Sequence, residues 1–285
     1  MRYYSLKVYS LGDEFEYPYI QILTEYLASN MRMSDREVKM IYYKYGKPIN
    51  ILGYYNSYDG YSRYRRITGG PPFKGRFLTY ISLIHPYYRG LRDLYKDISW
   101  LFSDLGIGLG SAGYINYDGD IHGVYGLTKL GGVAITEILI DIDIDIDFRD
   151  LEGKFIGLDV NEEYDLSRFD RLIWRYINRN WIGYSYEEGD VEEFLGDREG
   201  YYMKISLDIY EDLYIRKAYI EGNFNASPPS GPYTLVASIK GGQINELLFH
   251  QLKIGFKNID VHGIDDDTIN SGIDRLFEKA LEVVK

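Results

Sequence analysis

The chain has 285 residues, 45% of them hydrophobic and 26% charged, enough to bury the core of one large or two modest domains. The absence of cysteine excludes disulfides, thiolate metal sites and thiol nucleophiles. Four scattered histidines argue against a histidine metal site, and a net charge of −11 disfavours nucleic acid as the main partner. With no apolar run of about eighteen residues and no signal-peptide core, we expect a cytoplasmic protein without a membrane span.

The first half of the chain shows strand and helix patterns in turn. Apolar and alternating runs predict strands at 3–9, 37–45, 49–54 and 78–84, the second and third forming a pair across residues 46–48. Helical spacing predicts helices at 13–31, beginning near Pro18, and at 88–105. Residues 68–75 are expected to form a glycine- and proline-rich loop, and residues 107–117 to be extended.

The run EILIDIDIDIDF at 137–148 alternates strictly, which predicts a strand. Its four aspartates could attract a divalent cation, but we prefer a strand with isoleucines in the core and aspartates in water.

The second half predicts a separate unit. A helix is expected at 165–181, and the acidic, turn-rich stretch at 186–200 is the best domain boundary. Beyond it we expect strands at 201–209, 214–221 and 233–240, a helix near 243–252, a short strand and a final helix at 265–284. The prediction is an α+β fold with domains at 1–185 and 186–285.

The most informative segment is RRITGGPP at 65–72. Adjacent glycines let a backbone approach a ligand closely and present N–H groups to anionic oxygens, and arginines can grip phosphate or carboxylate in bidentate fashion. The alternative is a tight turn with two solvated arginines, which composition alone favours.

Two further segments carry candidate residues. GLTKLGGVA at 126–134 places Lys129 among glycines and apolar residues, where its ammonium could face a phosphate or carboxylate. Asn116 and Asp118, about a dozen residues earlier, could contact a nucleotide or Mg²⁺. The alternatives are a surface lysine on a turn and short polar residues that start a turn at Gly119.

Taken in order, these segments resemble the lipoate–protein ligase family. The resemblance covers roughly residues 1–180 and includes ILGYYN at 51–56, the arginine–glycine segment, the strand LTYISLI, INYD and TKLGGVA. IRKAYIEGNF at 215–224 is similar to the signature of the family's small accessory domain, with Asn223 where aspartate is common, and 238–249 resembles the next part of that domain. The resemblance implies the mixed-sheet catalytic fold of lipoate and biotin ligases, with a fused accessory domain.

The resemblance also implies a two-step reaction. A lipoyl or octanoyl carboxylate attacks the α-phosphate of ATP, and a lysine of an acceptor protein then attacks the acyl adenylate. Lys129 would be the catalytic cation, converging with the Arg65 and Arg66 guanidiniums on one cavity. The implied substrate- and nucleotide-binding residues are Arg65, Arg66, Thr68, Gly69, Gly70, Asn116, Asp118 and Gly131. Mg²⁺ would arrive with ATP, with Asp118 a weak candidate ligand, and the acceptor would be a lipoyl domain or a protein like the glycine-cleavage H protein.

Alternatives remain at this level. Transfer through a cysteine thioester is closed because the chain has no cysteine, and the Gly-Arg-Gly-rich motif of biotin ligases is not found. Pro71, Pro72 and Lys74 depart from the family pattern, in which a third glycine, small apolar residues and a histidine are usual. They motivate a second interpretation, a non-catalytic paralogue that binds a lipoyl-type ligand or carrier domain.

Overall fold

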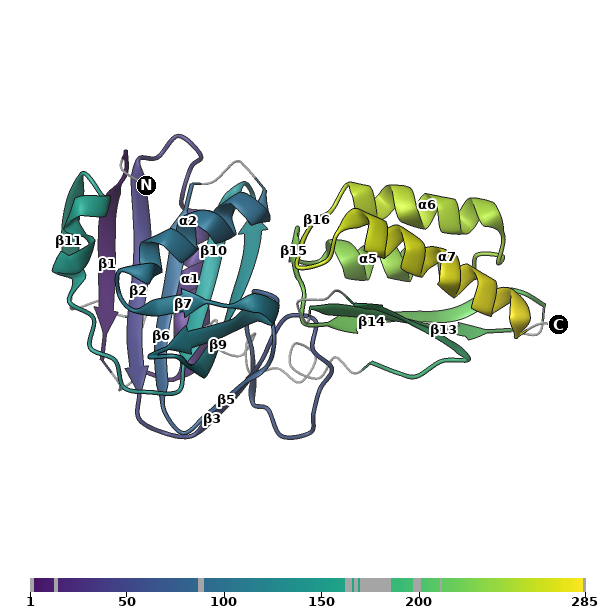
Figure 1. The fold of residues 1–285 in the computed structure, drawn as a ribbon, viewed down its shortest axis with the longest axis horizontal. Coiled ribbons are helices and arrows are strands. Elements are labelled where there is room, and N and C mark those ends of the chain that lie inside the picture. The colour runs from purple at the N-terminus through teal and green to yellow at the C-terminus, as the bar shows by residue number, and fades with distance from the viewer. Residues whose placement is uncertain are drawn as a thin grey trace.

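The computed structural model describes residues 3–12, 15–86, 90–161, 166, 169, 186–196, 201–210 and 212–283. These residues form two lobes side by side (Figure 1). The large lobe contains an eight-stranded sheet, and the small lobe contains a three-stranded sheet with helices packed on one face (Figure 1). The helix predicted at 165–181 falls almost entirely outside the described residues.

The eight-stranded sheet has the order β11-β1-β2-β6-β10-β9-β8-β7. β1 pairs in parallel with β11 and β2, and the remaining pairs are antiparallel, so the sheet is mixed, as predicted. Its strands are β1 (Ser5–Leu11), β2 (Glu37–Tyr45), β6 (Leu78–His85), β7 (Ile107–Leu109), β8 (Tyr114–Tyr117), β9 (Asp120–Leu130), β10 (Val133–Ile140) and β11 (Gly157–Asn161).

Two helices cover opposite faces of this sheet. α1 (Tyr17–Ser29) begins with a proline in its first turn, as predicted, and packs with one set of alternating strand residues. α2 (Leu91–Ser103) packs with the other set. Both faces are therefore apolar, and β6 and β10 are buried along their whole length. Two 3₁₀ segments, Ser111–Gly113 and Phe148–Lys154, complete the lobe.

The predicted pairing of 37–45 with 49–54 is wrong. Both segments are strands, but β2 joins the large sheet, whereas β3 (Ile49–Leu52) belongs to a separate small sheet with β4 (Tyr64–Arg65) and β5 (Phe73–Gly75). The reason is that β2 finds two long apolar partners, β1 and β6, and so leaves no edge for β3. The small sheet brackets the arginine–glycine loop and fixes where it begins and ends.

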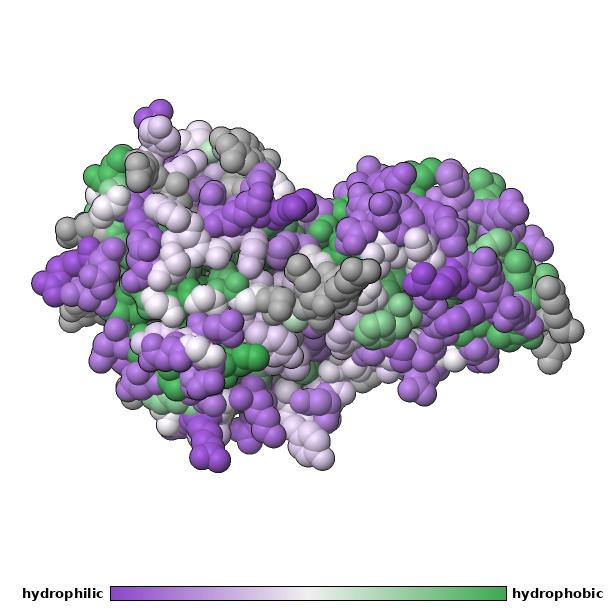
Figure 2. Space-filling model, viewed as in Figure 1, coloured by the Kyte–Doolittle hydropathy of each residue, from purple (hydrophilic) through white to green (hydrophobic). Residues whose placement is uncertain are grey.

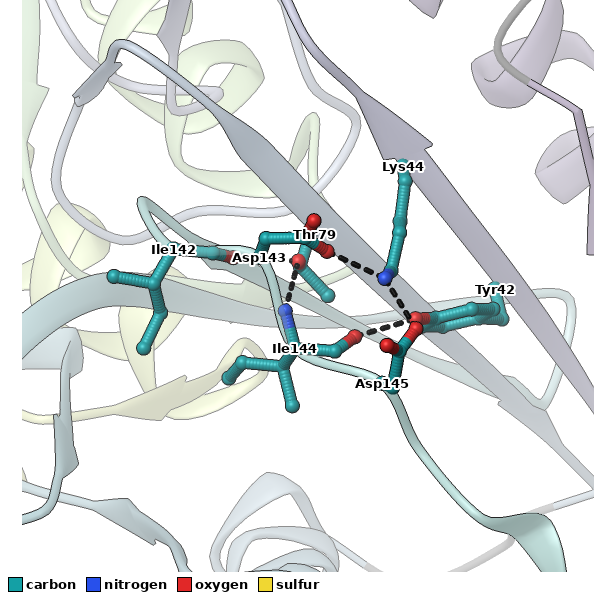
Figure 3. A network of polar contacts seen from close by, with 7 residues as sticks. All are labelled: Tyr42, Lys44, Thr79, Ile142, Asp143, Ile144 and Asp145. Carbon is teal, nitrogen blue, oxygen red and sulfur yellow. Dashed lines mark hydrogen bonds and ion pairs between the residues drawn. The ribbon is translucent and has the colours of Figure 1, made fainter.

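The strand predicted at 137–148 ends at Ile140. The following residues run as an extended segment held by side chains: the Thr79 hydroxyl donates to the Ile142 carbonyl at 2.6 Å, and the Tyr42 hydroxyl donates to the Ile144 carbonyl at 2.5 Å (Figure 3). The Lys44 ammonium binds both Asp143 and Asp145 (Figure 3).

The predicted orientation of this run is confirmed, because the isoleucines lie against the core and the aspartates at 143, 145 and 147 are exposed. The aspartates bind cationic side chains of the protein, and no group of three metal-ligating side chains occurs in the described residues.

The small lobe is an antiparallel sheet covered by helices. The strands are β12 (Val191–Gly196), β13 (Tyr202–Ile209) and β14 (Ile215–Gly222), and β15 (Asn225–Ser227) pairs with β16 (Asp260–His262). The helices are α5 (Gly231–Ser238), α6 (Glu246–Lys257) and α7 (Asp266–Glu282). On the face shown in Figure 2 the helices α6 and α7 present a mostly hydrophilic surface.

Most small-lobe predictions are confirmed, but the strand predicted at 233–240 is wrong. That segment is mostly α5, which begins after Ser230 with a proline in its first turn and packs through Val236. α6 and α7 begin at side-chain caps, where Asn245 accepts from Leu248 N at 2.9 Å and Asp265 accepts from Thr268 N at 2.7 Å. Each helix in the described part of the chain is too short or too polar to traverse a bilayer.

Candidate functional site

The two arginines of the glycine loop are buried. The Nη1 atom of Arg65 donates to the carbonyl oxygens of Gly53 at 2.8 Å and Asn56 at 2.7 Å. The Nε and Nη2 atoms of Arg66 donate to the Gly69 carbonyl at 3.0 and 2.6 Å. Arg66 therefore holds the glycine loop through its own carbonyl oxygen, and Arg65 holds the turn that follows β3. Neither is the solvated arginine of the simplest sequence interpretation.

A buried carboxylate lies beside the loop. Glu137 on β10 accepts from the Tyr80 hydroxyl at 2.7 Å, from Thr68 N at 3.2 Å and from Thr68 Oγ1 at 2.5 Å, and it also accepts from Gln21 Nε2. Burial lowers the pKa of Arg66, an effect that the nearby charge of Glu137 opposes. Burial raises the pKa of Tyr80, and Glu137 raises it further. The polar groups of Thr68 are thus already engaged within the protein.

Sequence reasoning missed the role of Glu137. Its signal was a single carboxylate inside the otherwise uncharged run VAITEILI, every residue of which is buried. A carboxylate in such a position needs several donors around it.

The small lobe closes over the glycine loop. The Gly70 amide donates to the Phe224 carbonyl at 3.1 Å. A side chain on Gly69 would collide with that same carbonyl, and Gly70 has a φ of 86°, so both positions require glycine. The accessory-type signature, IEGNF, therefore ends directly on the loop that carries the paired glycines.

Strand β15 continues this contact along the edge of β9. The side-chain oxygen of Asn225 accepts from Leu127 N at 2.7 Å, and the Thr128 hydroxyl donates to the Ala226 carbonyl at 2.9 Å. This stretch of β9 lies beyond the end of β8, so its outer edge is paired with the small lobe instead of a strand of its own sheet.

Two further contacts join the lobes on the α2 side. The Asp260 carboxylate accepts from Leu91 N at 2.7 Å and so caps the first turn of α2. The hydroxyls of Tyr125 and Tyr201 lie 2.7 Å apart. We call this set of contacts, made by Phe224, Asn225, Ala226, Tyr201 and Asp260 of the small lobe, the interlobe seam. It links the large sheet, the glycine loop and the first turn of α2.

Lys129 lies near the end of β9 and is partly buried. The turn that follows consists of Gly131 and Gly132, whose φ angles of 56° and 88° suit a type I′ hairpin. The structure thus gives Gly131 a turn role. Lys129 pairs with Ala134 across the hairpin.

Strand alternation places Lys129 on the α2 face of the sheet, with Leu127 and Tyr125. Glu137, whose charge acts on Arg66, pairs with Gly126 and faces the α1 side. The structure therefore places the Lys129 side chain and the Arg66 environment on opposite faces at one end of the same hairpin.

Asn116 and Asp118 lie at the other end of β9. Asp118 has a φ of 49° and forms with Gly119 the exposed two-residue turn between β8 and β9. Nine residues of strand separate this turn from Lys129, a span of about 30 Å. Asn116 is exposed and pairs with Ile121.

An open groove of about 310 Å³ lies beside this end of β9. Pro72 and Lys74, two of the residues that depart from the family's sequence pattern, line this groove, and Lys74 is exposed. The remaining lining residues are Phe73, Tyr114, Ile121, His122, Gly123, Val124 and Asp141.

The whole molecule has the fold of lipoate–protein ligases, a mixed-sheet lobe followed by a smaller α+β lobe. The structure is similar to P. falciparum LipL1 in complex with lipoate, with a TM-score of 0.65 and 11% identity over 96% of this chain and 99% of that one. Protein Ta0514 of T. acidophilum with bound lipoic acid gives a TM-score of 0.49 at 11% identity, over 62% of this chain and 99% of that one. No family model and no curated protein sequence matches the chain.

Proposed function

We propose that this chain is an ATP-dependent lipoate–protein ligase that forms an acyl adenylate and transfers the lipoyl or octanoyl group to a lysine of a lipoyl-domain acceptor. The observation that carries the proposal is the likeness to LipL1 with lipoate, which extends through both lobes and nearly the full length of each chain. The proposal includes Mg²⁺ as an ion that binds together with ATP.

In this proposal Lys129 supplies the cation. Negative charge builds on the α-phosphate during adenylate formation and on the acyl oxygen during transfer, and a fixed ammonium beside both oxygens lowers both barriers. Lys129 is held by a tight hairpin turn beside the interlobe seam, and a partly buried cation interacts more strongly than a solvated one.

The other candidate residues take different roles. Arg66 positions the glycine loop by binding its carbonyl oxygens, whereas Arg65 holds the neighbouring turn after β3. Gly69 and Gly70 let the small lobe approach the glycine loop closely. Asn116 and Asp118 lie about 30 Å from Lys129 along β9, too far for one ATP molecule to contact both ends, so the proposal leaves them out of the nucleotide site.

The test is release of pyrophosphate from ATP in the presence of lipoate and a lipoyl-domain acceptor. We expect Lys129→Ala to lower the rate by about 100-fold or more, and Lys47→Ala, which removes an exposed lysine from the turn between β2 and β3, to leave it unchanged. Equal rates for the Lys129 variant and the wild type would remove Lys129 from the mechanism.

The second candidate is a non-catalytic paralogue that binds a lipoyl-type ligand or carrier domain. A specific observation favours it: the Gly70 amide, Thr68 and the Arg66 guanidinium already bind acceptors within the protein. Binding of ATP without any release of pyrophosphate would support this candidate over the ligase.

A further inference from the structure

Side chains from two other elements bind the backbone amides at the start of the glycine loop. The Oε1 atom of Gln21, on α1, accepts from Ile67 N at 3.1 Å. The Oε2 atom of Glu137, on β10, accepts from Thr68 N at 3.2 Å and from Thr68 Oγ1 at 2.5 Å. Gln21 is 1% exposed and Glu137 is fully buried, so water does not compete for these bonds. The start of the loop is therefore fixed to both a helix and the sheet of the large lobe.

Gln21 and Glu137 also bind each other, which gives each side chain a single orientation. The Nε2 atom of Gln21 donates to Glu137 Oε1 and to the Tyr17 hydroxyl. The Tyr80 hydroxyl donates to the same Glu137 oxygen at 2.7 Å. Because Oε1 is committed to Gln21 and Tyr80, Oε2 is the oxygen that faces Thr68. The two side chains therefore act together, and we call them the Gln21–Glu137 clamp.

A loop with two adjacent glycines depends on such a clamp. Glycine restricts the backbone little, so Gly69 and Gly70 would otherwise leave the loop many conformations. In the observed conformation the loop lies against β9, where a side chain on Gly126 would collide with the Gly69 carbonyl oxygen. The Gly70 amide then donates to the Phe224 carbonyl of the small lobe at 3.1 Å. This contact lies beside a part of β9 that is three residues, or about 10 Å, from Lys129.

We propose that Gln21 and Glu137 are positioning residues, which hold the glycine loop in the conformation that places the small lobe beside Lys129. This inference rests on the proposed ligase function. Neither side chain needs to touch a substrate, because both act through the backbone of the loop. Loss of the clamp should therefore lower kcat through misplacement of the lobe, with little effect on KM for ATP.

The test compares Gln21→Met with Tyr80→Phe. Gln21→Met keeps the side-chain length and leaves the Ile67 amide without its acceptor, whereas Tyr80→Phe removes a donor from the Glu137 oxygen that does not face the loop. In Gln21→Met we expect the Gly70 amide hydrogen to exchange with solvent about tenfold faster. We also expect kcat for pyrophosphate release to fall about tenfold, with a change of less than about twofold in KM for ATP. Tyr80→Phe is the matched control and should change none of these quantities.

The measurements use the full chain at a temperature at which circular dichroism shows each variant to be folded. If Gln21→Met does not fold, Gln21→Asn replaces it, because its side chain is one methylene too short to reach Ile67. If the wild type releases pyrophosphate and the kcat of Gln21→Met equals that of Tyr80→Phe, the inference is overturned and the ligase function stands. A lower kcat without faster exchange of the Gly70 amide also overturns it, because Gln21 would then not act through the loop. If the wild type releases no pyrophosphate, the ligase function and the inference both fail.

Discussion

Replacing Glu137 by glutamine should destabilise the protein far more than a single oxygen-to-nitrogen exchange suggests. Glu137 accepts from Tyr80, from Gln21 and twice from Thr68. A glutamine amide must turn an N–H₂ group toward either the Thr68 amide or the Gln21 amide, and neither can accept. The Gln21 amide cannot reverse to relieve the conflict, because its oxygen already accepts from the Ile67 N–H.

The charge change adds to this cost. Arg66 is fully buried, and Glu137 is the first favourable charge acting on it. Removing the partner of a buried charge costs about 3–5 kcal/mol, so we expect the free energy of unfolding to fall by about 3 kcal/mol or more. At roughly 2–4 °C per kcal/mol for domains of this size, the melting temperature should fall by about 6–12 °C.

The assay is urea unfolding followed by intrinsic fluorescence, with Asp143→Asn as the control. Asp143 is also a carboxylate paired with a cation, but its side chain is 62% exposed and Lys44 keeps its bond to Asp145. Its loss should cost less than about 1 kcal/mol. If Glu137→Gln and Asp143→Asn lower the free energy of unfolding equally, burial of Glu137 and its hydrogen-bond donors does not determine the destabilisation.

Two further predictions concern α2 and the interlobe seam. Lys154 donates to the last-turn carbonyls of Trp100 and Leu101 at 2.9 and 3.0 Å, so Lys154→Met should lower the free energy of unfolding by about 2 kcal/mol in the same urea assay; a loss below about 0.5 kcal/mol would contradict this. Burial lowers the pKa of His262, 5.0 Å from Tyr95 between ring centroids, to about 4. The unfolded chain therefore binds the proton more readily, and the free energy of unfolding should fall as the pH drops from about 6.5 to 4. The melting temperature of His262→Phe should depend less on pH over this range than that of the wild type. An identical pH dependence for the two proteins would contradict this prediction.

The larger elements could be predicted from sequence because their patterns are local. The helices at α1, α2 and α7 and the strand β6 follow from apolar spacing alone. The failures involve tertiary partners. The apolar residues of segment 233–240 fit the spacing of a strand as well as that of a helix. The proline in the first turn of α5 and the packing of α5 against β14 favour the helix.

The strand 137–148 illustrates a second kind of failure. Its alternation correctly separates core from solvent, but a ladder also needs a partner strand. After Ile140 the segment is held by Thr79 and Tyr42 side chains instead of a ladder. Periodicity reports which face is buried, and it does not report which strand lies alongside.

The candidate site shows the same limit. The segment around residues 65–70 was recognisable from its residue types, but whether a guanidinium meets a ligand or a carbonyl depends on the path of the backbone around it. The Glu137 carboxylate was visible in the sequence only as a lone charge in an apolar run, and its four donors become evident only when its neighbours are placed.

The seam along β9 has a consequence for how the molecule unfolds. β15 covers the outer edge of β9 through hydrogen bonds of the Asn225 and Thr128 side chains. The small-lobe core contains Tyr55, which comes from the large-lobe half of the sequence and donates to the Pro229 carbonyl at 2.5 Å. Detaching the small lobe would therefore expose the Leu127 and Gly70 amides and the aromatic ring together. Such shared elements couple the two cores energetically, so heat or denaturant should melt both in a single cooperative transition.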